Sequence, residues 1–322
     1  MSISSRDSKT SVVTGAAGFI GSHLVDRLLE RGDRVIGLDN LALGKQANLS
    51  KAAQHPKFTF RQLDVNDWQA CADFLRAVAG GTPVDTVWHL AANSDIQAGV
   101  EDPDVDLRQT FLTTYNVLKL MRTLGIGKIV FASTSAIYGE HADALKEDSG
   151  PLLPISNYGA MKLASEAIIS AAVERFLRQA WICRFPNVVG GRATHGAIYD
   201  FLRKLRSNPK ELEVLGDGTQ EKPYLHVSEL IEAMVWIYER STGGLNYFNI
   251  APTSGSTTVR YIAEAVVRTA APGAAIRYTG GSRGWIGDVP RFRYSVEKLT
   301  ALGWSPRLSS NEAIERAIAE NL

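Results

Sequence analysis

A tyrosine and a lysine lie one helical turn apart in the segment Tyr158-Gly159-Ala160-Met161-Lys162. At this spacing, the phenol and the ammonium lie on the same face of a helix. A neighbouring cation favours the phenolate, so we expect Lys162 to lower the pKa of Tyr158 from about 10 toward neutral pH. Such a tyrosine can take a proton from a substrate hydroxyl, and Thr134 would hydrogen-bond the same oxygen. The pattern predicts a general acid–base site.

Spacing alone does not identify this pair, because Tyr115…Lys119 and Tyr294…Lys298 share it. Only Tyr158…Lys162 follows an apolar stretch that ends in a hydroxyl cluster, Ser133-Thr134-Ser135. The alternative is an exposed tyrosine–lysine pair on a helix. We assign the catalytic roles to Thr134, Tyr158 and Lys162 because of the position of the strand and its hydroxyl groups.

A glycine-rich turn, Thr14-Gly15-Ala16-Ala17-Gly18-Phe19-Ile20-Gly21, lies near the start of the chain. Gly15 allows a tight turn, and Gly18 leaves room for a pyrophosphate. Gly21 allows the next helix to pack closely on the preceding strand. The helix N-terminus offers N–H groups and a positive dipole end to phosphates. Three glycines in a turn also arise for purely conformational reasons, so the following strand must support this interpretation.

That strand, residues 34–38, ends in Asp39, about 20 residues beyond the glycines, where a carboxylate accepts hydrogen bonds from an adenosine ribose. A carboxylate there also repels a 2′-phosphate, which favours NAD over NADP. The alternative is an Asp that forms a turn with Asn40. A positively charged nicotinamide beside Tyr158 would further favour the phenolate. The other residues expected to bind the cofactor lie in the turn and at later strand ends: Phe19, Ile20, Asn40, Asp64, Val65, Leu90, Ala91 and Ala92.

Strands and helices alternate along the first 185 residues with connections of crossover length, which predicts an α/β fold with a doubly wound parallel sheet. The predicted strands cover residues 11–14, 34–38, 58–63, 85–92, 128–134 and 181–185. The longest predicted helices cover about 104–124 and 157–178. We expect a Rossmann NAD-binding domain at 1–185, to which a segment near 224–250 returns. Residues 186–322 would form a smaller α/β substrate domain, with the cleft at the carboxyl ends of the strands.

The 322-residue chain has 45% hydrophobic and 21% charged residues and a formal net charge of +1. With no basic cluster, neither nucleic acid nor a membrane is an expected partner. Two cysteines in apolar stretches, without a signal peptide, predict a cytoplasmic protein. His195 and His226 fit no metal-ligand spacing, so no metal is expected. His89 is expected to be buried and hydrogen-bonded rather than a ligand.

Together these motifs resemble the extended short-chain dehydrogenases/reductases, specifically the NAD-dependent sugar-nucleotide epimerase/dehydratase family typified by UDP-glucose 4-epimerase. The similar stretches run from Thr14–Leu24 and Asp39-Asn40 through Asp64-Val65, His89–Ala92, Ser133–Gly139 and Tyr158–Lys162. The resemblance implies a nucleotide-sugar substrate, UDP- or thymidine-linked. It also implies a homodimer formed through the two long helices. Both helices carry apolar residues on more than one side, including Leu107, Tyr115, Leu163 and Ile168.

The resemblance also implies substrate contacts in the second half of the chain. Asn187 matches a residue that contacts the nucleotide diphosphate, and Leu212–Gly218, with Val214, resembles the uracil-contacting strand and turn. Arg283 and Asp288 resemble a pair that holds diphosphate and ribose, although a surface-loop role is the alternative for Arg283. Lys222 stands where many relatives have Arg, so it would meet a phosphate as a point charge, or simply be exposed. Ser135 and Arg192 would face the sugar.

Departures from the family pattern indicate the reaction. The residues after Thr134 are Ser135 and Ala136, where 4,6-dehydratases have Asp-Glu and UDP-glucuronate decarboxylases have a Glu. Elimination of water needs a proton donor for the departing oxygen, so their absence favours 4-epimerisation. The resemblance implies oxidation at C4 to a 4-keto sugar, rotation of that sugar, and return of hydride to its other face. Tyr158 would serve as base and then acid, while NAD is regenerated in each turnover.

Two alternatives accompany this hypothesis. A dehydratase would use the same 4-keto intermediate, and a non-catalytic NAD-sensing protein would keep the fold without the reaction. The presence of Thr134, Tyr158 and Lys162 speaks against the second. Glucose/galactose, N-acetylhexosamine and uronic acid substrates are all compatible with the sequence.

Overall fold

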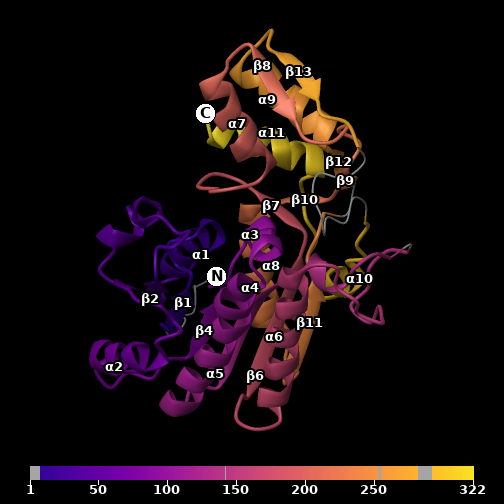
Figure 1. Ribbon diagram of the computed structural model, residues 1–322. Helices are drawn as coiled ribbons and strands as arrows, with labels where there is room; N and C mark the ends of the chain where they lie inside the picture. Colours follow the sequence, from indigo (N-terminus) through magenta and orange to yellow (C-terminus); the bar gives the residue numbers. More distant parts are fainter. Residues whose placement is uncertain (1–7, 142, 253–254, 282–291) are drawn as a thin grey trace, which may run out of the picture.

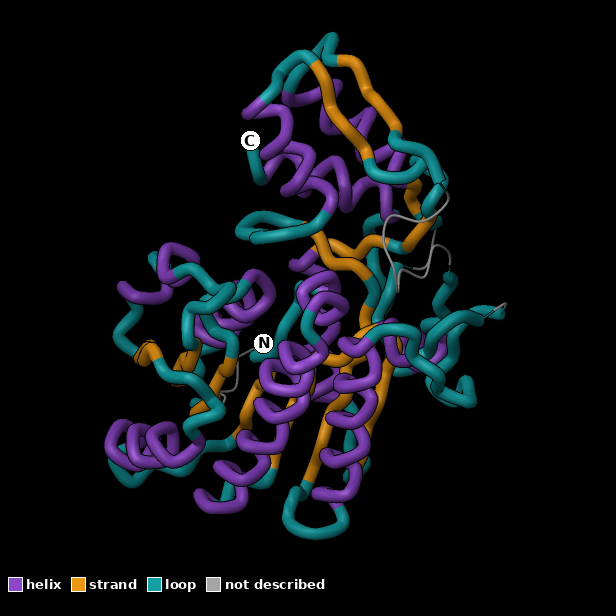
Figure 2. The backbone as a smooth tube through the Cα atoms, viewed as in Figure 1, coloured by secondary structure: helices purple, strands orange, loops and turns teal. Residues whose placement is uncertain are grey.

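The computed structural model describes residues 8–141, 143–252, 255–281 and 292–322. Figure 1 shows a larger body in which strands lie among long helices, and a smaller body above it that contains α7, α9 and α11. Figure 2, in the same view, shows the long helices beside the strands of the larger body. The strand β6 (Gln179–Phe185) leads directly into β7 (Asn187–Val189), which begins the chain's path toward the smaller body.

The larger body is built on a seven-stranded sheet in the order β11-β6-β5-β4-β1-β2-β3, in which every neighbouring pair is parallel. Its other strands are β1 (Thr10–Thr14), β2 (Arg34–Asp39), β3 (Phe58–Gln62), β4 (Thr86–His89), β5 (Lys128–Thr134) and β11 (Leu245–Asn249). Because β1 pairs with both β2 and β4, the strand order reverses there and leaves a crevice at the carboxyl ends. The predicted doubly wound α/β fold is confirmed.

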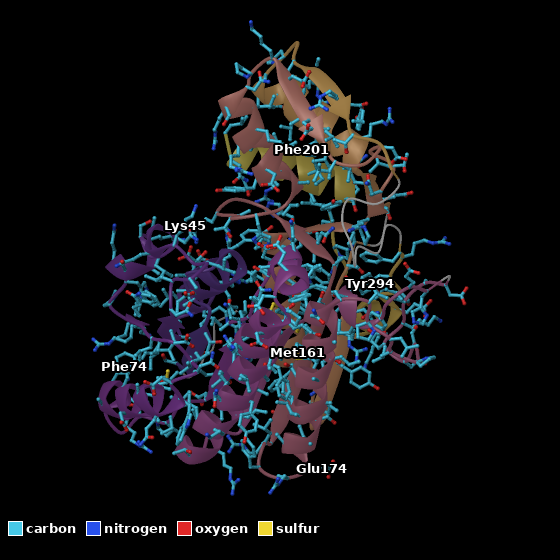
Figure 3. The ribbon with its side chains drawn as sticks, viewed as in Figure 1. Lys45, Phe74, Met161, Glu174, Phe201 and Tyr294 are labelled. Atoms are coloured by element: carbon cyan, nitrogen blue, oxygen red, sulfur yellow. The ribbon has the colours of Figure 1, made fainter. Side chains whose placement is uncertain are left out.

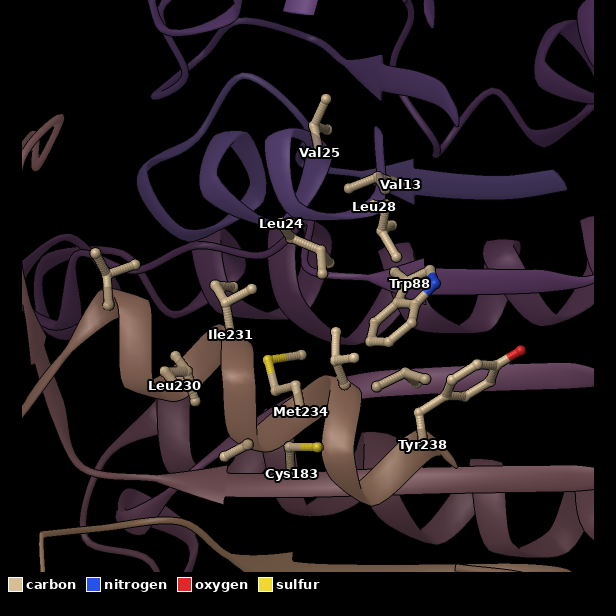
Figure 4. Packing of buried hydrophobic residues seen from close by; sticks show 14 of the residues in the cluster. Val13, Leu24, Val25, Leu28, Trp88, Cys183, Leu230, Ile231, Met234 and Tyr238 are labelled. Atoms are coloured by element: carbon tan, nitrogen blue, oxygen red, sulfur yellow. The ribbon is translucent and has the colours of Figure 1, made fainter. Parts of the chain in front are cut away.

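Helices cover both faces of this sheet, as buried parallel strands require. The helices α1 (Phe19–Glu30) and α8 (Val227–Arg240) pack on one face. The other face is covered by α2 (Trp68–Ala79), α5 (Leu112–Leu124) and α6 (Asn157–Val173). Figure 4 shows Leu24 and Leu28 of α1 near Met234 and Tyr238 of α8, with Trp88 of the sheet among them.

The smaller body has its own buried cluster, formed by α7 (Ala197–Ser207), α9 (Val259–Ala270) and α11 (Ser310–Glu320) against two strands. These strands, β8 (Glu211–Val214) and β13 (Ala275–Tyr278), pair in parallel. Between the two bodies, β7 pairs in parallel with β10 (Tyr224–His226). The chain then returns to the larger body, where α8 packs on the sheet and β11 pairs with β6.

The remaining elements are short. They are α3 (Ile96–Glu101), α10 (Glu297–Ala301), β9 (Glu221–Lys222), β12 (Thr257–Thr258) and the 3₁₀ turns η1 (Gln46–Leu49), η2 (Ala52–Gln54) and η4 (Ser135–Ile137). Among the helices of the described residues, none is both long enough and apolar enough to span a bilayer.

Two predicted helices differ from the structure. The helix expected at 104–124 is divided into α4 (Pro103–Asp106), a π-helical turn η3 (Leu107–Phe111) and α5. The π-helical turn widens the helix where it buries Asp106, and a pattern of apolar residues does not register such a local change. The helix expected to run toward Arg178 ends at Val173, because Phe176 and Leu177 fold back to donate to the Ala172 carbonyl.

Close packing between α1 and the glycine turn generates a testable prediction. A Cβ atom on Gly21 would lie 1.9 Å from the Gly15 carbonyl oxygen, which is backbone and cannot move aside. We therefore expect Gly21→Ala to lower the free energy of unfolding by about 1–3 kcal/mol, the range typical of overpacking. Urea denaturation measures this. As a control, Gly244→Ala adds a Cβ 3.5 Å from Val173 Cγ1 and should unfold like the wild type. Equal stability of Gly21→Ala and the wild type would contradict the packing argument.

Candidate active site

A cavity of about 810 Å³ lies at the carboxyl ends of the sheet strands and continues to the smaller body. Its walls include residues of the glycine turn, the ends of β2, β4 and β5, the start of α6, and α7. It brings together every residue that we expected to bind the cofactor: Gly15, Gly18, Phe19, Ile20, Gly21, Asp39, Asn40, Asp64, Val65, Leu90, Ala91, Ala92, Tyr158 and Lys162.

The glycine turn has the geometry that a phosphate site requires. Gly15 has a φ of +70°, and a Cβ atom there would lie 2.8 Å from the Ala91 nitrogen. The turn therefore passes directly against the end of β4, where any other residue would be strained. Gly18 is the N-cap of α1 and no side chain caps it, so the first turn of the helix presents its backbone to the cavity.

Asp39 ends β2 with its carboxylate against this turn. It accepts hydrogen bonds from the backbone N–H groups of Ala17, at 2.9 Å, and Leu41, at 2.7 Å. Burial raises the pKa of Asp39, and the backbone N–H groups oppose that rise. Beside it, Asn40 Nδ2 donates to Asp64 Oδ2 at 3.1 Å. A turn with glycine at the positions that face the cavity, and a carboxylate at the end of the neighbouring strand, fit the diphosphate and the ribose of NAD.

His89 is a buried, hydrogen-bonded residue, as predicted. Its side chain is fully buried, and its ring nitrogens lie 2.7 Å from Thr14 Oγ1 and 3.1 Å from Thr114 Oγ1. Burial, with a smaller contribution from the charge of Lys162, lowers the pKa of His89 to about 3. It is therefore neutral and ties β4 to β1 and α5.

The predicted catalytic residues meet where β5 ends and α6 begins. Ser156 caps α6 by accepting from the Gly159 N–H, which fixes the start of the helix. Thr134, the last residue of β5, hydrogen-bonds the Tyr158 hydroxyl. Lys162 is buried and donates from Nζ to the Ala132 carbonyl at 2.7 Å, and its Nζ lies 5.8 Å from the Tyr158 ring centroid.

Burial dominates the pKa values of the chain's own groups in this cluster. Burial raises the pKa of Tyr158 to about 12, which the hydrogen bond from Thr134 opposes and the charge of Asp106 reinforces. Burial also lowers the pKa of Lys162 to about 7, against the charges of Glu166 and Asp106. The expected lowering of the Tyr158 pKa invoked the positive charge of a nicotinamide as well as that of Lys162, so it stays a prediction.

The two other tyrosine–lysine pairs do not line this cavity. Tyr115 is 49% exposed on α5, and Lys119 Nζ lies over the rings of Tyr115 and Trp68. Tyr294, labelled in Figure 3, packs edge-on against Tyr138, while Lys298 donates to the Tyr247 carbonyl. Position along the fold therefore separates three pairs of identical spacing.

A buried ion pair between Arg184 and Glu166, which the sequence did not indicate, holds α6 against the sheet. Arg184, on β6, donates from Nε and Nη2 to the Glu166 carboxylate at 3.0 and 2.7 Å. Ser133 donates from its hydroxyl to the same carboxylate. Arg184 also donates from Nη1 to the Tyr138 hydroxyl at 3.0 Å. These contacts fix α6 to β5 and β6 one helical turn beyond Lys162.

Of the residues expected to bind substrate, Thr134, Ser135, Asn187, Val214 and Lys222 line the cavity. They come from the end of β5, η4, β7, β8 and β9, so both bodies contribute.

We expected Arg192 to face the sugar, and the structure corrects this. Arg192 does not line the cavity, although the nearby residues Gly190 and Ala193 do. Its backbone has a φ of +68°, and its guanidinium donates to Asp26 on α1 at 2.8 Å. Arg283 and Asp288 lie outside the described residues.

The cavity also contains residues that the sequence did not single out. Gln220 is 3% exposed, and its Oε1 has no hydrogen-bond partner among the described residues. Tyr199 of α7 lines the cavity, and Nζ of Lys45, in the loop after β2, lies 5.8 Å from the centroid of its ring. Figure 3 labels Lys45 on the larger body and Phe201, also of α7, on the smaller one. Nothing in the sequence distinguishes these side chains from ordinary polar turn and helix residues.

The chain is similar to known proteins over nearly its whole length. A putative UDP-glucose 4-epimerase of Methanocaldococcus jannaschii is 30% identical to the chain, over 95% of this chain and 96% of its own. The structure of a Thermus thermophilus UDP-glucose 4-epimerase in complex with NAD superposes with a TM-score of 0.83 at 32% identity, over 97% of this chain and 98% of its own. UDP-glucuronic acid decarboxylase 1 of Arabidopsis thaliana is 28% identical, over 96% of this chain and 69% of its own.

The model of the NAD-dependent epimerase/dehydratase family matches residues 11–251, which include the glycine turn, Asp39 and the cluster of Thr134, Tyr158 and Lys162. The chain therefore belongs to the NAD-dependent epimerase/dehydratase family, within the extended short-chain dehydrogenases/reductases.

Proposed function

We propose that the chain catalyses the 4-epimerisation of a UDP-hexose through a transient 4-keto sugar. The observation that carries the proposal is the cluster of Thr134, Tyr158 and Lys162 in the wall of a cavity shared by both bodies. The family membership supports NAD-dependent chemistry on a nucleotide sugar. The choice of epimerisation rests on the loop after Thr134.

Each residue of the cluster has a separate role in this proposal. Tyr158 takes the proton of the sugar O4 hydroxyl and later returns it. Thr134, already hydrogen-bonded to Tyr158, holds the sugar oxygen in line with the phenol. Lys162 supplies positive charge that stabilises the Tyr158 phenolate before it takes the O4 proton and after it returns that proton. Bound NAD supplies the acceptor, and then the donor, of the hydrogen on C4.

The loop after Thr134 favours epimerisation over elimination. Ser135 and Ala136 form the 3₁₀ turn η4, and the Ala136 carbonyl packs against Gly159 so closely that a Cβ there would lie 2.4 Å away. This turn carries no carboxylic acid to protonate a departing oxygen. A dehydratase would need that proton from elsewhere in the cavity.

The proposal also assigns the cofactor and the substrate to different parts of the chain. Residues 1–185, with the return segment near 224–250, would bind NAD, and the rest of 186–322 would bind the UDP moiety. Asn187 and Lys222 would contact the diphosphate, and Val214 the base. Ser135 would face the sugar, and Arg283 and Asp288 would complete the diphosphate and ribose contacts.

The products of nucleotide sugars test the reaction. We expect the protein with NAD to convert a UDP-hexose into its C4 epimer without a change of mass, because no group leaves the sugar. Mass spectrometry with chromatography measures this for UDP-glucose, UDP-N-acetylglucosamine, UDP-glucuronate and dTDP-glucose. Loss of one water would identify a dehydratase instead, and loss of carbon dioxide a decarboxylase. No conversion of any of them would contradict the proposal.

Tyr158→Phe tests the proton transfer. We expect turnover to fall by about 10²–10⁴-fold, the contribution typical of a general acid–base residue, while NAD binding persists. Steady-state kinetics and quenching of tryptophan fluorescence by NAD measure the two effects. Tyr115→Phe, the exposed member of an identically spaced pair, is the matched control and should match the wild type. Unchanged turnover in Tyr158→Phe would remove that residue from the mechanism.

We further propose that the chain forms a homodimer through α5, α6 and the helical turns before α5. Apolar side chains remain exposed there, with Val100 38%, Leu107 39% and Tyr115 49% exposed. Figure 1 shows α5 and α6 side by side along the same side of the sheet. Exposed apolar residues along α5 and the helical turns before it suit a twofold helical interface.

The molar mass in solution tests the dimer. At micromolar concentration we expect light scattering to give twice the chain mass of 35.1 kDa. Replacing Leu107 and Tyr115 together by Glu should return the mass to that of one chain, because charges would be buried in the interface. Leu322→Glu, which changes another exposed apolar residue, should leave the dimer intact. A monomeric wild type would refute the interface.

A further inference from the structure

An irregular segment, residues 190–196, connects β7 to α7 and forms part of the cavity wall. Figure 1 shows it as a loop between these two elements. Gly190 and all residues from 193 to 199 line the cavity, whereas Gly191 and Arg192 do not. The backbone groups of such a segment must find their hydrogen-bond partners in neighbouring elements. Those partners therefore determine where this part of the wall lies.

The end of α11 holds the segment from the smaller body. Glu320 Oε2 accepts a hydrogen bond from the Gly191 N–H at 2.9 Å. Asn321, which lines the cavity, donates from Nδ2 to the Gly190 carbonyl at 3.0 Å. Glu320 Oε2 also lies 3.2 Å from Nε2 of His226, at the end of β10. One carboxylate therefore joins α11, β10 and the 190–196 segment.

The helix α1 holds the same segment from the larger body. The Gly191 carbonyl accepts a hydrogen bond from His23 Nε2 at 2.9 Å, and the Arg192 guanidinium donates to Asp26 at 2.8 Å. The N–H of Gly191 is thus bonded to the smaller body and its carbonyl to the larger one. Loss of the Glu320 carboxylate would release one side of Gly191 and leave the other side held.

The hydrogen bonds to Glu320 are of the strong kind, because its carboxylate is ionised at neutral pH. Burial acts to raise the pKa of Glu320, and the hydrogen bond from the Gly191 N–H acts to lower it. Contacts with His226 and Arg316 lower it further, so the net pKa lies below its usual value. Burial lowers the pKa of His226, so this ring is neutral. Its Nδ1 accepts from the Ser228 N–H, which leaves the hydrogen on Nε2, facing Glu320.

We propose that Glu320 is a positioning residue for the nucleotide sugar, whose carboxylate holds the 190–196 segment so that this wall of the cavity is formed before the ligand binds. Glu320 itself does not line the cavity and acts through Gly191. A loop that already has its bound position loses less conformational entropy on binding. The inference rests on the proposed function, in which residues of the smaller body bind the UDP moiety.

The place of Glu320 in the fold allows a clean substitution. Its side chain is 32% exposed, and it is the last residue of α11. The residues that pack this helix into the smaller body lie elsewhere along it: Ala313, Ile314, Ala317 and Ile318. A change at Glu320 therefore releases the segment without emptying that buried cluster.

Binding of UDP to the chain saturated with NAD tests the proposal. We expect Glu320→Ala to raise the Kd of UDP about tenfold in calorimetry, the factor that corresponds to fixing one more backbone residue on binding. The affinity for NAD, measured by tryptophan fluorescence, should not change, whereas a general structural defect would weaken both ligands. Glu315→Ala is the matched control, because it removes another carboxylate of α11, which pairs with Arg268, and both affinities should match the wild type.

Glu320→Gln separates the hydrogen bond from the charge. Its amide oxygen can still accept from the Gly191 N–H, so this variant should recover most of the UDP affinity that Glu320→Ala loses. Urea denaturation checks that both variants are folded. An equal loss of UDP affinity in the two variants would overturn the proposal, and so would an unchanged Kd in folded Glu320→Ala.

Amide hydrogen exchange tests the same step in the absence of UDP. We expect peptides that cover residues 190–196 to exchange faster in Glu320→Ala than in the wild type, and saturating UDP to slow them again. Equal exchange in the two free proteins would show that Glu320 does not hold the segment. A wild-type chain that fails to bind UDP would instead contradict the proposed function. The two failures are therefore distinguishable, because the exchange of the free proteins requires neither UDP nor turnover.

Discussion

The burial of one positive charge constrains much of this structure. Lys162 carries its ammonium into the junction between β5 and α6, where water cannot solvate it. The protein offsets this with the Ala132 carbonyl, the face of the Phe131 ring 4.7 Å from Nζ, and two carboxylates. Because these groups come from three chain segments, β5, α6 and the helical turns before α5 must meet in one arrangement.

Glycines make that arrangement possible at the positions where backbone segments touch. Gly21 lets α1 reach the turn after β1, Gly159 lets α6 reach η4, and Gly99 admits the Asp106 carboxyl. Each contact fixes one wall of the same cavity. The glycine turn and the cluster of Thr134, Tyr158 and Lys162 are therefore held in place by close contacts between backbone segments.

The parts of the fold and of the candidate site that depend on short sequence motifs could be predicted from the sequence. The glycine turn, the strand ends at Asp39 and Thr134, and the spacing of Tyr158 and Lys162 are short motifs in alternating elements, so their approach followed from the predicted sheet. The π-helical turn could not be foreseen, because one widened turn barely disturbs an apolar pattern. The raised pKa of Tyr158 and the pairing of Arg192 with Asp26 depend on segments distant in sequence, which no local pattern encodes.

The contact between Arg192 and Asp26 has a geometric consequence. In the same stretch, the Gly191 carbonyl accepts a hydrogen bond from His23 Nε2, so two residues of α1 anchor the connection between β7 and α7. The helix whose first turn faces the cavity thus also sets the starting point of the opposite wall. The first turn of α1 and the residues Gly190 and Ala193 of this connection all line the cavity. A displacement of α1 would therefore move both parts of the cavity wall together.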